Sequence, residues 1–364
     1  MEISSLTTSV LLLSFALAFI FGAAAQASNF CTMGAVADVT NFGDWTRARL
    51  VLTAIAVAIF GTGALIYFGD ADLSKSIYAS PKLLWLSHIV GGLVFGFGMT
   101  IASGCGSKTL LRVGGGSLKA VVTLVVMAIA SYMTLKGLFA IFRVNILDKA
   151  TLSLPAAQLL PSLFGLGKAA AFGLAALVSG VVMAFVLANK DFRGQPKLLL
   201  AGAVIGLTVV GGWWTTATFG FVAEHPDTLQ AAYLATNSNR PESFSFTAPV
   251  AYGLELLMLW SDKSTVLTFG IAAVLGMVAG GAVMALVTKT FRWESFANAE
   301  DMANHLVGGV MMGFGGVTAL GCTIGQGASG LSVLSVGAFI TVLAIVIGSR
   351  LAIGYQMFRI DRMS

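Results

Sequence analysis

Long apolar runs alternate with short polar stretches along the whole chain. Nine of these runs approach the ~20 residues that a helix needs to cross a bilayer core of about 30 Å. They cover residues 6–27, 50–68, 83–102, 118–142, 169–188, 198–221, 265–287, 306–320 and 331–355. The pattern predicts an all-α integral membrane protein with about nine transmembrane helices in a lipid bilayer. The first run ends in alanines like a signal peptide, but no Lys or Arg precedes it, so we interpret it as a retained span.

The composition excludes several classes of protein. Only 10% of the 364 residues are charged, against roughly 25% in an ordinary soluble domain, and this excludes a soluble enzyme. The net charge of +5 is spread over the loops and does not form the continuous basic face that nucleic acid requires. The three cysteines lie far apart without a CxxC pair, so we expect no disulfide framework and no metal site. No dinucleotide fingerprint is complete, and we expect no cofactor.

Basic residues in the predicted loops indicate the orientation of the chain. If the N-terminus lies outside, most of these residues lie inside, including Arg47, Arg49, Lys108 and Arg112. An excess of Lys and Arg in cytoplasmic loops is the usual arrangement in membrane proteins. We therefore expect the N-terminus outside and the C-terminus inside.

A segment of nineteen residues occurs twice in the chain. Residues 88–106 reappear as residues 305–323, and the identical positions include His88/His305, two Gly-Phe-Gly triplets and two Gly-Cys pairs. The sequence therefore predicts two membrane repeats, residues 1–145 and 196–364, joined by a connecting span in residues 146–195. Because that span crosses the membrane once, the second repeat is inverted, as in many transporters.

Each copy of the repeat leads to a Gly-Cys pair, Gly104-Cys105 and Gly321-Cys322. There the apolar run stops and a polar, glycine-rich segment begins, which is typical of two half-helices that meet inside the membrane. A helix N-terminus carries free N–H groups and about half a positive charge, so two of them directed at one point form an anion site. We predict that these four residues line a substrate path.

The third cysteine, Cys31, follows the first span in a short segment of mixed polarity that we interpret as re-entrant. The second repeat has no cysteine at the corresponding place. The strict offset puts Ala248 there, and a slip of three residues puts Ser245 there. The residues alone leave two roles open for Cys31, a small buried apolar residue or a part of the path.

Thiols at an anion path favour one class of substrate. A neutral thiol is a weak hydrogen-bond donor with a soft, polarisable sulfur. Such a group suits a large sulfur-containing anion better than phosphate, which calls for Arg or Lys. Several weak sites in series also let the ion leave again, as conduction requires.

Taken together, these motifs resemble the YeeE/YedE family of membrane proteins. The resemblance rests on the segment F-C-x2-G-A-x2-D from Phe30 to Asp38, with Arg47 and Arg49 behind it, and on the two Gly-Phe-Gly…Gly-Cys segments. It covers essentially the whole chain. It implies an inverted-repeat fold with short re-entrant helices, in a bacterial inner (cytoplasmic) membrane.

The resemblance also implies a function and a partner. Thiosulfate or a related sulfur compound would pass inward, and the thiols of Cys31, Cys105 and Cys322 would line its path. Members of the family are associated with a small cytoplasmic sulfur carrier, TusA-like, which is a candidate partner here. The chain departs from members with a fourth cysteine, since it has none near Ser245, and some relatives are linked to selenium rather than thiosulfate.

Two further pairs of residues are candidates for gating or coupling. His88 and His305 begin equivalent spans and are suited to hold protons, although a structural role is common for such histidines. Asp38 and Glu255 are paired by the same offset. For these two acids we consider coupling, helix capping, or ion pairs with Arg47 and Lys263.

Two segments near the outer surface receive ordinary interpretations. Trp213-Trp214 ends the sixth predicted span and reads as part of an aromatic belt at the membrane surface. Residues 224–246 form the longest predicted outer loop.

The hypothesis that we favour is an inner-membrane transporter, not an enzyme, that imports a sulfur-containing anion past thiols that donate but do not react. A first alternative is a membrane thiol redox or persulfide-transfer protein. This alternative needs two cysteines within disulfide reach, with Cα atoms less than about 7 Å apart. The others are a transporter of a selenium compound and a scaffold subunit.

Overall fold

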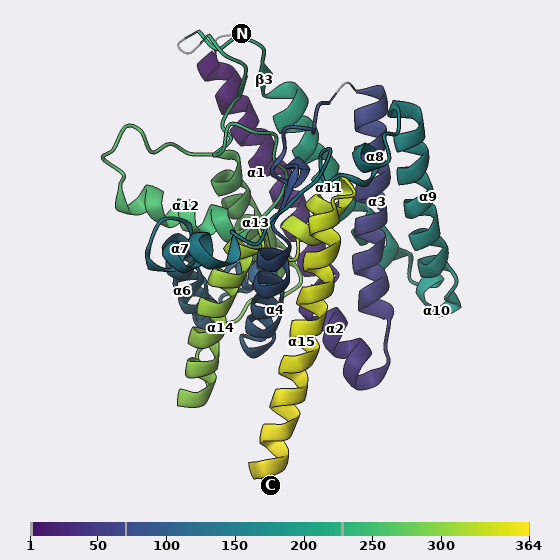
Figure 1. Cartoon of the computed structure of the whole chain (residues 1–364). Coiled ribbons are helices and arrows are strands. Elements are labelled where there is room, and N and C mark those ends of the chain that lie inside the picture. Colours follow the sequence, from purple (N-terminus) through teal and green to yellow (C-terminus); the bar gives the residue numbers. More distant parts are fainter. Residues whose placement is uncertain (1–2, 70, 227–228, 364) are drawn as a thin grey trace.

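The chain folds into a bundle of long helices with shorter helical segments between them (Figure 1). The computed structural model describes residues 3–69, 71–226 and 229–363. The long helices are α1 (Ile3–Ala27), α3 (Thr46–Phe68), α4 (Trp85–Ile101), α6 (Leu118–Leu135), α9 (Lys168–Leu187), α11 (Pro196–Trp214), α13 (Phe269–Val287), α14 (Ala299–Thr318) and α15 (Val336–Met363).

Shorter elements fill the connections. The short α-helices are α2 (Thr32–Phe42), α5 (Gly106–Gly114), α7 (Leu138–Phe142), α8 (Leu160–Leu163), α10 (Lys190–Arg193) and α12 (Thr247–Met258). A 3-10 turn, η1 (Ile77–Ala79), and three π-helical segments, η2 (Arg143–Leu147), η3 (Thr215–Phe219) and η4 (Gly325–Gly330), complete the helical structure. Two antiparallel ribbons pair β1 (Lys82–Leu83) with β2 (Leu152–Ser153) and β3 (Phe221–Val222) with β4 (Ala232–Tyr233).

The prediction of an all-α integral membrane protein is confirmed. In the described ranges, eight helical stretches are long and apolar enough to cross a membrane, one fewer than the nine apolar runs. The run at 306–320 does form a helix, α14, but its first turn carries Glu300 and Asp301, which lowers its mean hydropathy. The run at 118–142 is interrupted after Leu135, where α6 ends and the separate short helix α7 follows.

Close packing of α4 against α14 depends on glycines of the repeated segment. A Cβ on Gly91 would lie 2.8 Å from the carbonyl oxygen of Gly315, and one on Gly315 would lie 2.6 Å from that of Gly91. Gly98 and Gly308 face each other in the same reciprocal way, at 2.9 and 2.6 Å. The two helices are therefore antiparallel, and each glycine face lets the other backbone approach.

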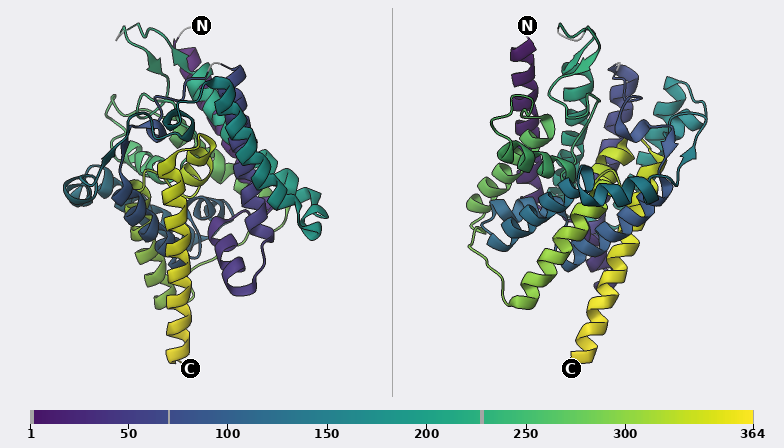
Figure 2. Two further views of the ribbon diagram at one scale, coloured as in Figure 1. Left: turned by 45° about the vertical axis from the view of Figure 1, so that its right-hand side comes forward. Right: turned by 60° about the vertical axis from the view of Figure 1, so that its left-hand side comes forward.

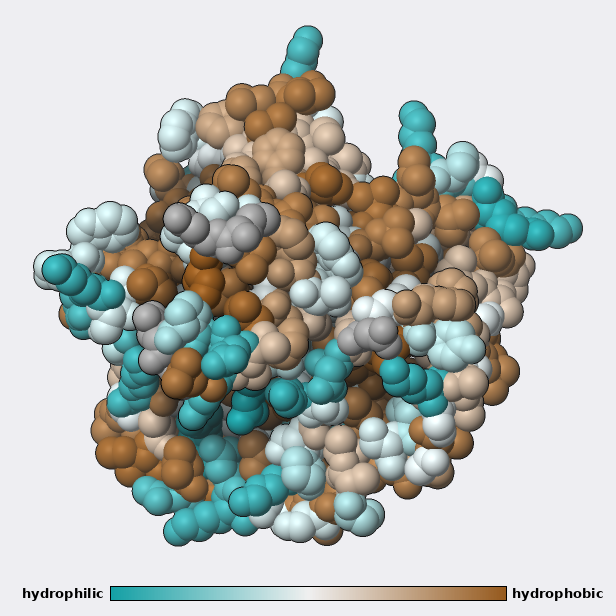
Figure 3. Space-filling view, turned by 90° about the horizontal axis from the view of Figure 1, so that it is seen from above, coloured by the Kyte–Doolittle hydropathy of each residue, from teal (hydrophilic) through white to brown (hydrophobic). Residues whose placement is uncertain are grey.

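The remaining helix pairs have matching partners in the two halves of the chain. Helix α4 packs on α15 while α14 packs on α6, and α1 packs on α13 while α3 packs on α11. Helices α1 and α15 bring the two termini to opposite ends of the molecule (Figures 1 and 2). Seen from the N-terminal end, hydrophobic residues cover much of the molecule, while hydrophilic residues form a band across the middle and also lie at several points of the margin (Figure 3).

Candidate functional site

The first cysteine stands in a break between two helices. Helix α1 ends at Ala27, Asn29 takes a left-handed conformation with φ +52°, and the Phe30 N–H donates to the Ala25 carbonyl at 2.9 Å. This hydrogen bond closes the end of α1 in the manner of a Schellman motif. Cys31 then caps α2, because its sulfur accepts the Gly34 N–H at 3.3 Å.

The other two cysteines stand in breaks of the same geometry. Before Cys105, Ser103 has φ +55° and the Gly104 N–H donates to the Met99 carbonyl at 2.8 Å; before Cys322, Leu320 has φ +59° and the Gly321 N–H donates to the Gly316 carbonyl at 2.8 Å. The sulfur of Cys105 faces the backbone N–H of Lys108, and that of Cys322 accepts the Gly325 N–H at 3.5 Å. Each thiol is thus held by the amide three residues further on.

These breaks bring the thiols into one buried region. All three cysteines are free, with Cys31 5% exposed and Cys105 and Cys322 fully buried. The thiols of Cys31 and Cys105 lie beside each other, and Cys105 also contacts the Ser107 hydroxyl at 3.2 Å. The hydroxyl of Thr323, the neighbour of Cys322, lies next to Cys105 as well. The first and second halves of the chain therefore meet at this point.

Thr323 leaves a hydrogen-bonding capacity unused at the junction. Its hydroxyl is buried, and although it lies next to the Cys105 thiol it has no partner in good hydrogen-bond geometry among the described residues. An unpaired buried hydroxyl costs about 1–3 kcal/mol, and Thr323 is one of eight such hydroxyls in the described residues. What sets it apart is its place next to Cys105 and Cys322. The position between Cys105 and Cys322 is therefore suited to a bound group that accepts or donates a hydrogen bond there.

Phenol and hydroxyl groups surround Cys322 on the side of the N-terminal end. The Tyr78 phenol lies in electrostatic range of Cys322, and its ring packs edge-on against Trp213 at 6.0 Å between centroids. Gly325 fits between Tyr78 and Ser245, because a Cβ at this position would lie 2.7 Å from the Ser245 hydroxyl oxygen. Ser245 thus lies beside the Cys322 break in the way that Cys31 lies beside Cys105.

Basic groups surround the Cys31–Cys105 pair on the side of the C-terminal end. Lys108 is within electrostatic range of both thiols and of Arg47 and Arg112. The Arg47 guanidinium packs against Gly34, the residue whose N–H holds Cys31.

A cavity of about 320 Å³ lies next to this basic region. Its lining includes Met33, two residues after Cys31, and Ser103, two residues before Cys105. Polar side chains from α2 and α15, Asn41 and Gln356, also face it. The cavity therefore extends from the thiol pair towards the C-terminal end of the molecule.

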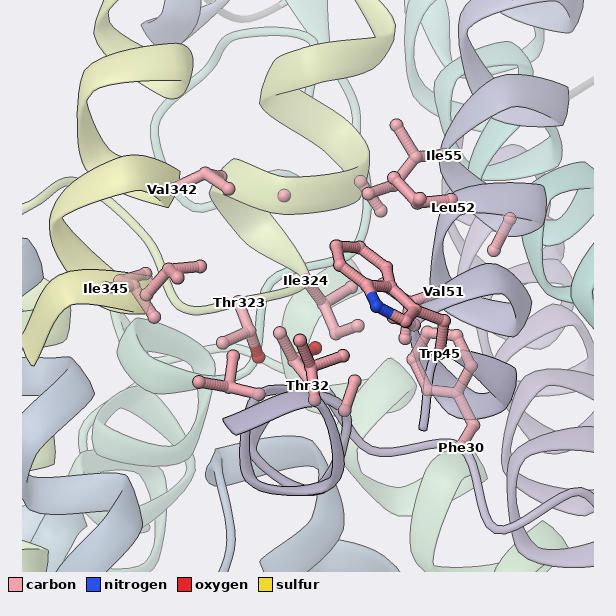
Figure 4. Close-up of a pocket in the computed structure, with 18 of the residues that line it drawn as sticks. Phe30, Thr32, Trp45, Val51, Leu52, Ile55, Thr323, Ile324, Val342 and Ile345 are labelled. Atoms are coloured by element: carbon pink, nitrogen blue, oxygen red, sulfur yellow. The ribbon is translucent and has the colours of Figure 1, made fainter. Parts of the chain in front are cut away.

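A second cavity, of about 310 Å³, lies to the side of the thiols between α3 and α15 (Figure 4). Apolar side chains such as Phe30, Val51, Leu52 and Ile345 line most of it. Its polar lining includes the hydroxyls of Thr32, Thr40 and Thr323 and the side chain of Arg350. Because most of the lining is apolar, the cavity offers few hydrogen-bond donors to an anion, so we place it beside the candidate site.

The two candidate histidines are buried and structurally engaged. His88 Nδ1 lies 2.7 Å from the Thr341 hydroxyl, and His305 Nδ1 lies 2.8 Å from the Asp301 carbonyl oxygen and 3.0 Å from its carboxylate. The Nε2 atom of each ring has no hydrogen-bond partner among the described residues. Neither histidine makes a contact with a cysteine that the structure records, and their role in gating stays a prediction.

The two candidate acids form separate ion pairs. Asp38 lies 3.4 Å from Arg47, which is one of the pairings considered from the sequence. Glu255 pairs with Lys136 at 2.7 Å, not with Lys263, and also accepts the Tyr132 hydroxyl at 3.1 Å. Lys136 is available for this pair because α6 ends just before it.

Two interpretations of the outer segments were wrong in part. Trp213 is fully buried and its Nε1–H donates to the Ser332 hydroxyl at 3.0 Å, so it is not part of a surface belt, whereas Trp214 is 40% exposed. The end of the predicted outer loop enters the core, where Phe244 and Phe246 are fully buried. The sequence analysis did not identify Tyr78 or Glu242 as residues near the cysteines. For the buried segment, the alternation of Ser and Phe over residues 243–246 was the available signal.

The described residues offer no metal site, since no three His, Cys, Asp or Glu side chains gather there. The arrangement instead combines buried thiols, backbone N–H groups and one unpaired hydroxyl. Such groups bind a ligand by hydrogen bonds rather than by coordination, and the N–H groups favour a negative charge.

Known proteins share this sequence over most of its length. The chain is 24% identical over 338 residues to the thiosulfate transporter TsuA of Escherichia coli K12, covering 90% of each chain. It is 25% identical over 347 residues to the thiosulfate transporter TsuA of Spirochaeta thermophila, covering 91% of this chain and 94% of the relative. A shorter match, 27% identical over 94 residues, links 25% of this chain to 21% of the probable transporter YedE of Escherichia coli K12.

The characteristic sequence of one family, described as sulphur transport, matches residues 27–351. That range contains all three cysteine breaks and both copies of the repeated segment. The chain therefore belongs to the sulphur transport family.

Proposed function

We propose that this membrane protein imports a sulfur-containing anion, thiosulfate or a close relative, past the three cysteine thiols. The observation that carries the proposal is the convergence of Cys31, Cys105 and the Cys322 segment around the unpaired hydroxyl of Thr323. We propose thiosulfate as the substrate because the two relatives that match most of the chain are named thiosulfate transporters. A selenium compound stays an alternative substrate.

The contacts suggest an order for the path. The anion enters between Tyr78 and Ser245, meets Cys322, passes Thr323, and reaches the Cys105–Cys31 pair. It leaves past Lys108 and the cavity of about 320 Å³. In this order the thiols lie in series, so no single site needs to bind tightly, which favours release.

The thiols act in this proposal as donors and do not react. The anion loses water on entering the buried region, and S–H groups and the amides of Gly34, Lys108 and Gly325 replace part of its hydration. The S–H form is required because a thiolate would repel the anion. No bond to sulfur forms or breaks, so the protein is not an enzyme on this proposal.

Orientation follows from the position of the cations. With the N-terminus outside a bacterial inner membrane, Lys108 and Arg47 lie on the cytoplasmic side, in line with the positive-inside tendency. The reciprocal contacts of Gly91 with Gly315 and Gly98 with Gly308 support two inverted repeats, 1–145 and 196–364. The cytoplasmic sulfur carrier stays a prediction.

Uptake of sulfur-labelled thiosulfate into cells that lack their own importers tests the proposal. We expect uptake with the wild type and its loss in Cys105→Ser and Cys322→Ser, because serine keeps a donor but not the soft sulfur. Ser179→Ala serves as control, since that hydroxyl is buried far along α9 and bonds the Ala56 carbonyl. Undiminished uptake by both cysteine variants, at matched expression, would overturn the thiol path.

A second candidate function draws on the neighbouring thiols of Cys31 and Cys105. A membrane thiol redox or persulfide-transfer protein would use this pair reactively. Thiol labelling with and without reductant, together with intact mass after thiosulfate exposure, separates the two. A persulfide or a reversible disulfide that accumulates during uptake would favour the reactive function.

A further inference from the structure

Glu242 lies in a segment that is fixed inside the outer half of the molecule. Its backbone carbonyl oxygen accepts a hydrogen bond from the Thr216 hydroxyl at 2.6 Å, and its backbone N–H donates to the oxygen of that Thr216 hydroxyl at 3.1 Å. On the next two residues, the Ser243 hydroxyl donates to the Val209 carbonyl and the Phe244 carbonyl accepts the Ser329 hydroxyl. The segment is thus held between α11 and the helical segment that follows Cys322.

The carboxyl of Glu242 has few groups to stabilise its charge. It accepts one hydrogen bond, from the Asn237 N–H at 3.1 Å. No Lys, Arg or His of the described chain forms an ion pair with it, and the titratable side chains facing it are the phenols of Tyr78 and Tyr252. Burial, offset only in part by the Asn237 N–H, raises the pKa of Glu242 to about 7.

Tyr78 connects this acid with the entrance of the path. The Tyr78 phenol lies in electrostatic range of both Glu242 and Cys322. Glu242 also lies three residues before Ser245, which packs against Gly325, the residue whose N–H holds Cys322. A negative charge on the half-buried Glu242 would therefore act on an anion that approaches Cys322. Because Glu242 forms no ion pair in the described part of the chain and accepts a single hydrogen bond, protonation of the carboxyl is what removes this repulsion.

We propose that Glu242 is a proton-binding site at the outer entrance, and that an anion occupies the position beside Cys322 only while Glu242 is protonated. Binding of the anion from outside then takes up a proton from the same side. This inference rests on the proposed import of a sulfur anion, and it makes the outer site specific for an anion together with a proton. Glu242 does not contact the substrate and acts through the local charge.

Counterflow of labelled thiosulfate in proteoliposomes tests the inference, with the full chain and the same pH on both sides so that no proton gradient drives transport. Thiosulfate stays a dianion from about pH 6 to about pH 8, whereas a carboxyl with a pKa of about 7 loses most of its proton. We expect wild-type counterflow to fall about tenfold over this range. Glu242→Gln should remove the fall and keep the rate at about pH 8 close to the rate at about pH 6.

Two variants serve as controls. Glu224→Gln removes an exposed carboxyl from the same outer region and should keep the wild-type pH profile. Glu242→Asp keeps a titratable carboxyl, so it should keep a fall with pH even where Glu242→Gln folds poorly.

A readout other than transport is the proton taken up on binding. In lightly buffered solution, addition of thiosulfate to wild-type protein near pH 7 should make the medium more alkaline, and the Glu242→Gln variant should not. Counterflow that is independent of pH in the wild type, or an unchanged pH profile in Glu242→Gln, would overturn the inference alone. Absence of thiosulfate counterflow at every pH would instead contradict the proposed function.

Discussion

The two ends of the proposed path differ in the side chains around their thiols. Next to Cys31 and Cys105 lie the cations Lys108 and Arg47, the second of them paired with Asp38. Next to Cys322 lie the uncharged phenol of Tyr78 and, beyond it, the carboxyl of Glu242. The backbone geometry of the breaks is nevertheless the same. The helix breaks therefore supply N–H donors at both ends, while the side chains around them set the sign of the local charge.

On the proposed import path, this difference would make the electrostatic potential more favourable to a dianion near Lys108 than near Cys322. Variants of Thr323, Gly325, Lys108 and Ser245 can show which residues produce this contrast.

Among the tests of this contrast, the largest effect is expected at the junction of the two ends. Thr323→Val removes the unpaired buried hydroxyl beside Cys105 and keeps the shape of the side chain. We expect uptake to fall about tenfold, which corresponds to about 1.4 kcal/mol, while the melting temperature rises because an unpaired polar group is lost. Uptake assays and thermal unfolding in detergent measure the two quantities.

Thr208→Val is the matched control for this prediction. Thr208 is also buried, but its hydroxyl already donates to the Ile205 carbonyl at 2.7 Å. Its loss should lower the melting temperature slightly and leave uptake unchanged. If Thr323→Val lowered the melting temperature and left uptake intact, the hydroxyl would be structural and the junction would not be a binding position.

A smaller loss of uptake is expected when the space between Gly325 and Ser245 is narrowed. Gly325→Ala places a methyl group 2.7 Å from the Ser245 hydroxyl oxygen, so one of the two segments must shift. We expect uptake to fall about fivefold, or about 1 kcal/mol, and Ser245→Gly in the same chain to restore most of it. Gly354→Ala, where no atom lies within 4 Å of the added Cβ, is the control, and failure of the double variant to recover would argue against a local clash.

The helix breaks at the cysteines were predictable from the sequence, because neighbouring residues determine where a helix ends. The Gly-Cys pairs mark the breaks because an apolar run stops there and glycine-rich polar sequence begins, and the structure has helix ends at those positions. Asn29, in the left-handed conformation that Asn tolerates, gives Cys31 the same break.

The contacts between distant segments were not predictable. Tyr78 and Ser245 reach the Cys322 break, and Glu242 reaches Tyr78, through the packing of two connections. Hydropathy places such connections at the surface. Trp213 shows the same limit of prediction from sequence. A pair of tryptophans at the end of an apolar helix is compatible with a membrane surface and equally with a buried hydrogen bond such as the one to Ser332. Local pattern determines where helices end, but the fold determines which ends meet.

The inner end can be tested through its cation. Lys108→Gln removes the charge in range of both thiols and should slow uptake about threefold, by about 0.7 kcal/mol, because the anion loses part of its attraction to the exit. Lys75→Gln removes an exposed charge from the outer connection and should have no effect. Equal slowing by both variants would indicate a general surface-charge effect instead of an inner site.

The smallest effect is expected from making the two ends more alike. Ser245 occupies the place beside Cys322 that Cys31 occupies beside Cys105, so Ser245→Cys gives the outer end a second thiol. If thiols are preferred because their sulfur is soft, uptake at limiting thiosulfate should rise about twofold, by about 0.4 kcal/mol, and Ser245→Ala should lower it by a similar factor. Initial rates at low substrate, at matched expression, measure the change. A rise with Ser245→Ala as large as that with Ser245→Cys would mean that the hydroxyl merely obstructs the entrance, and the resemblance between the two ends would then be one of backbone shape alone.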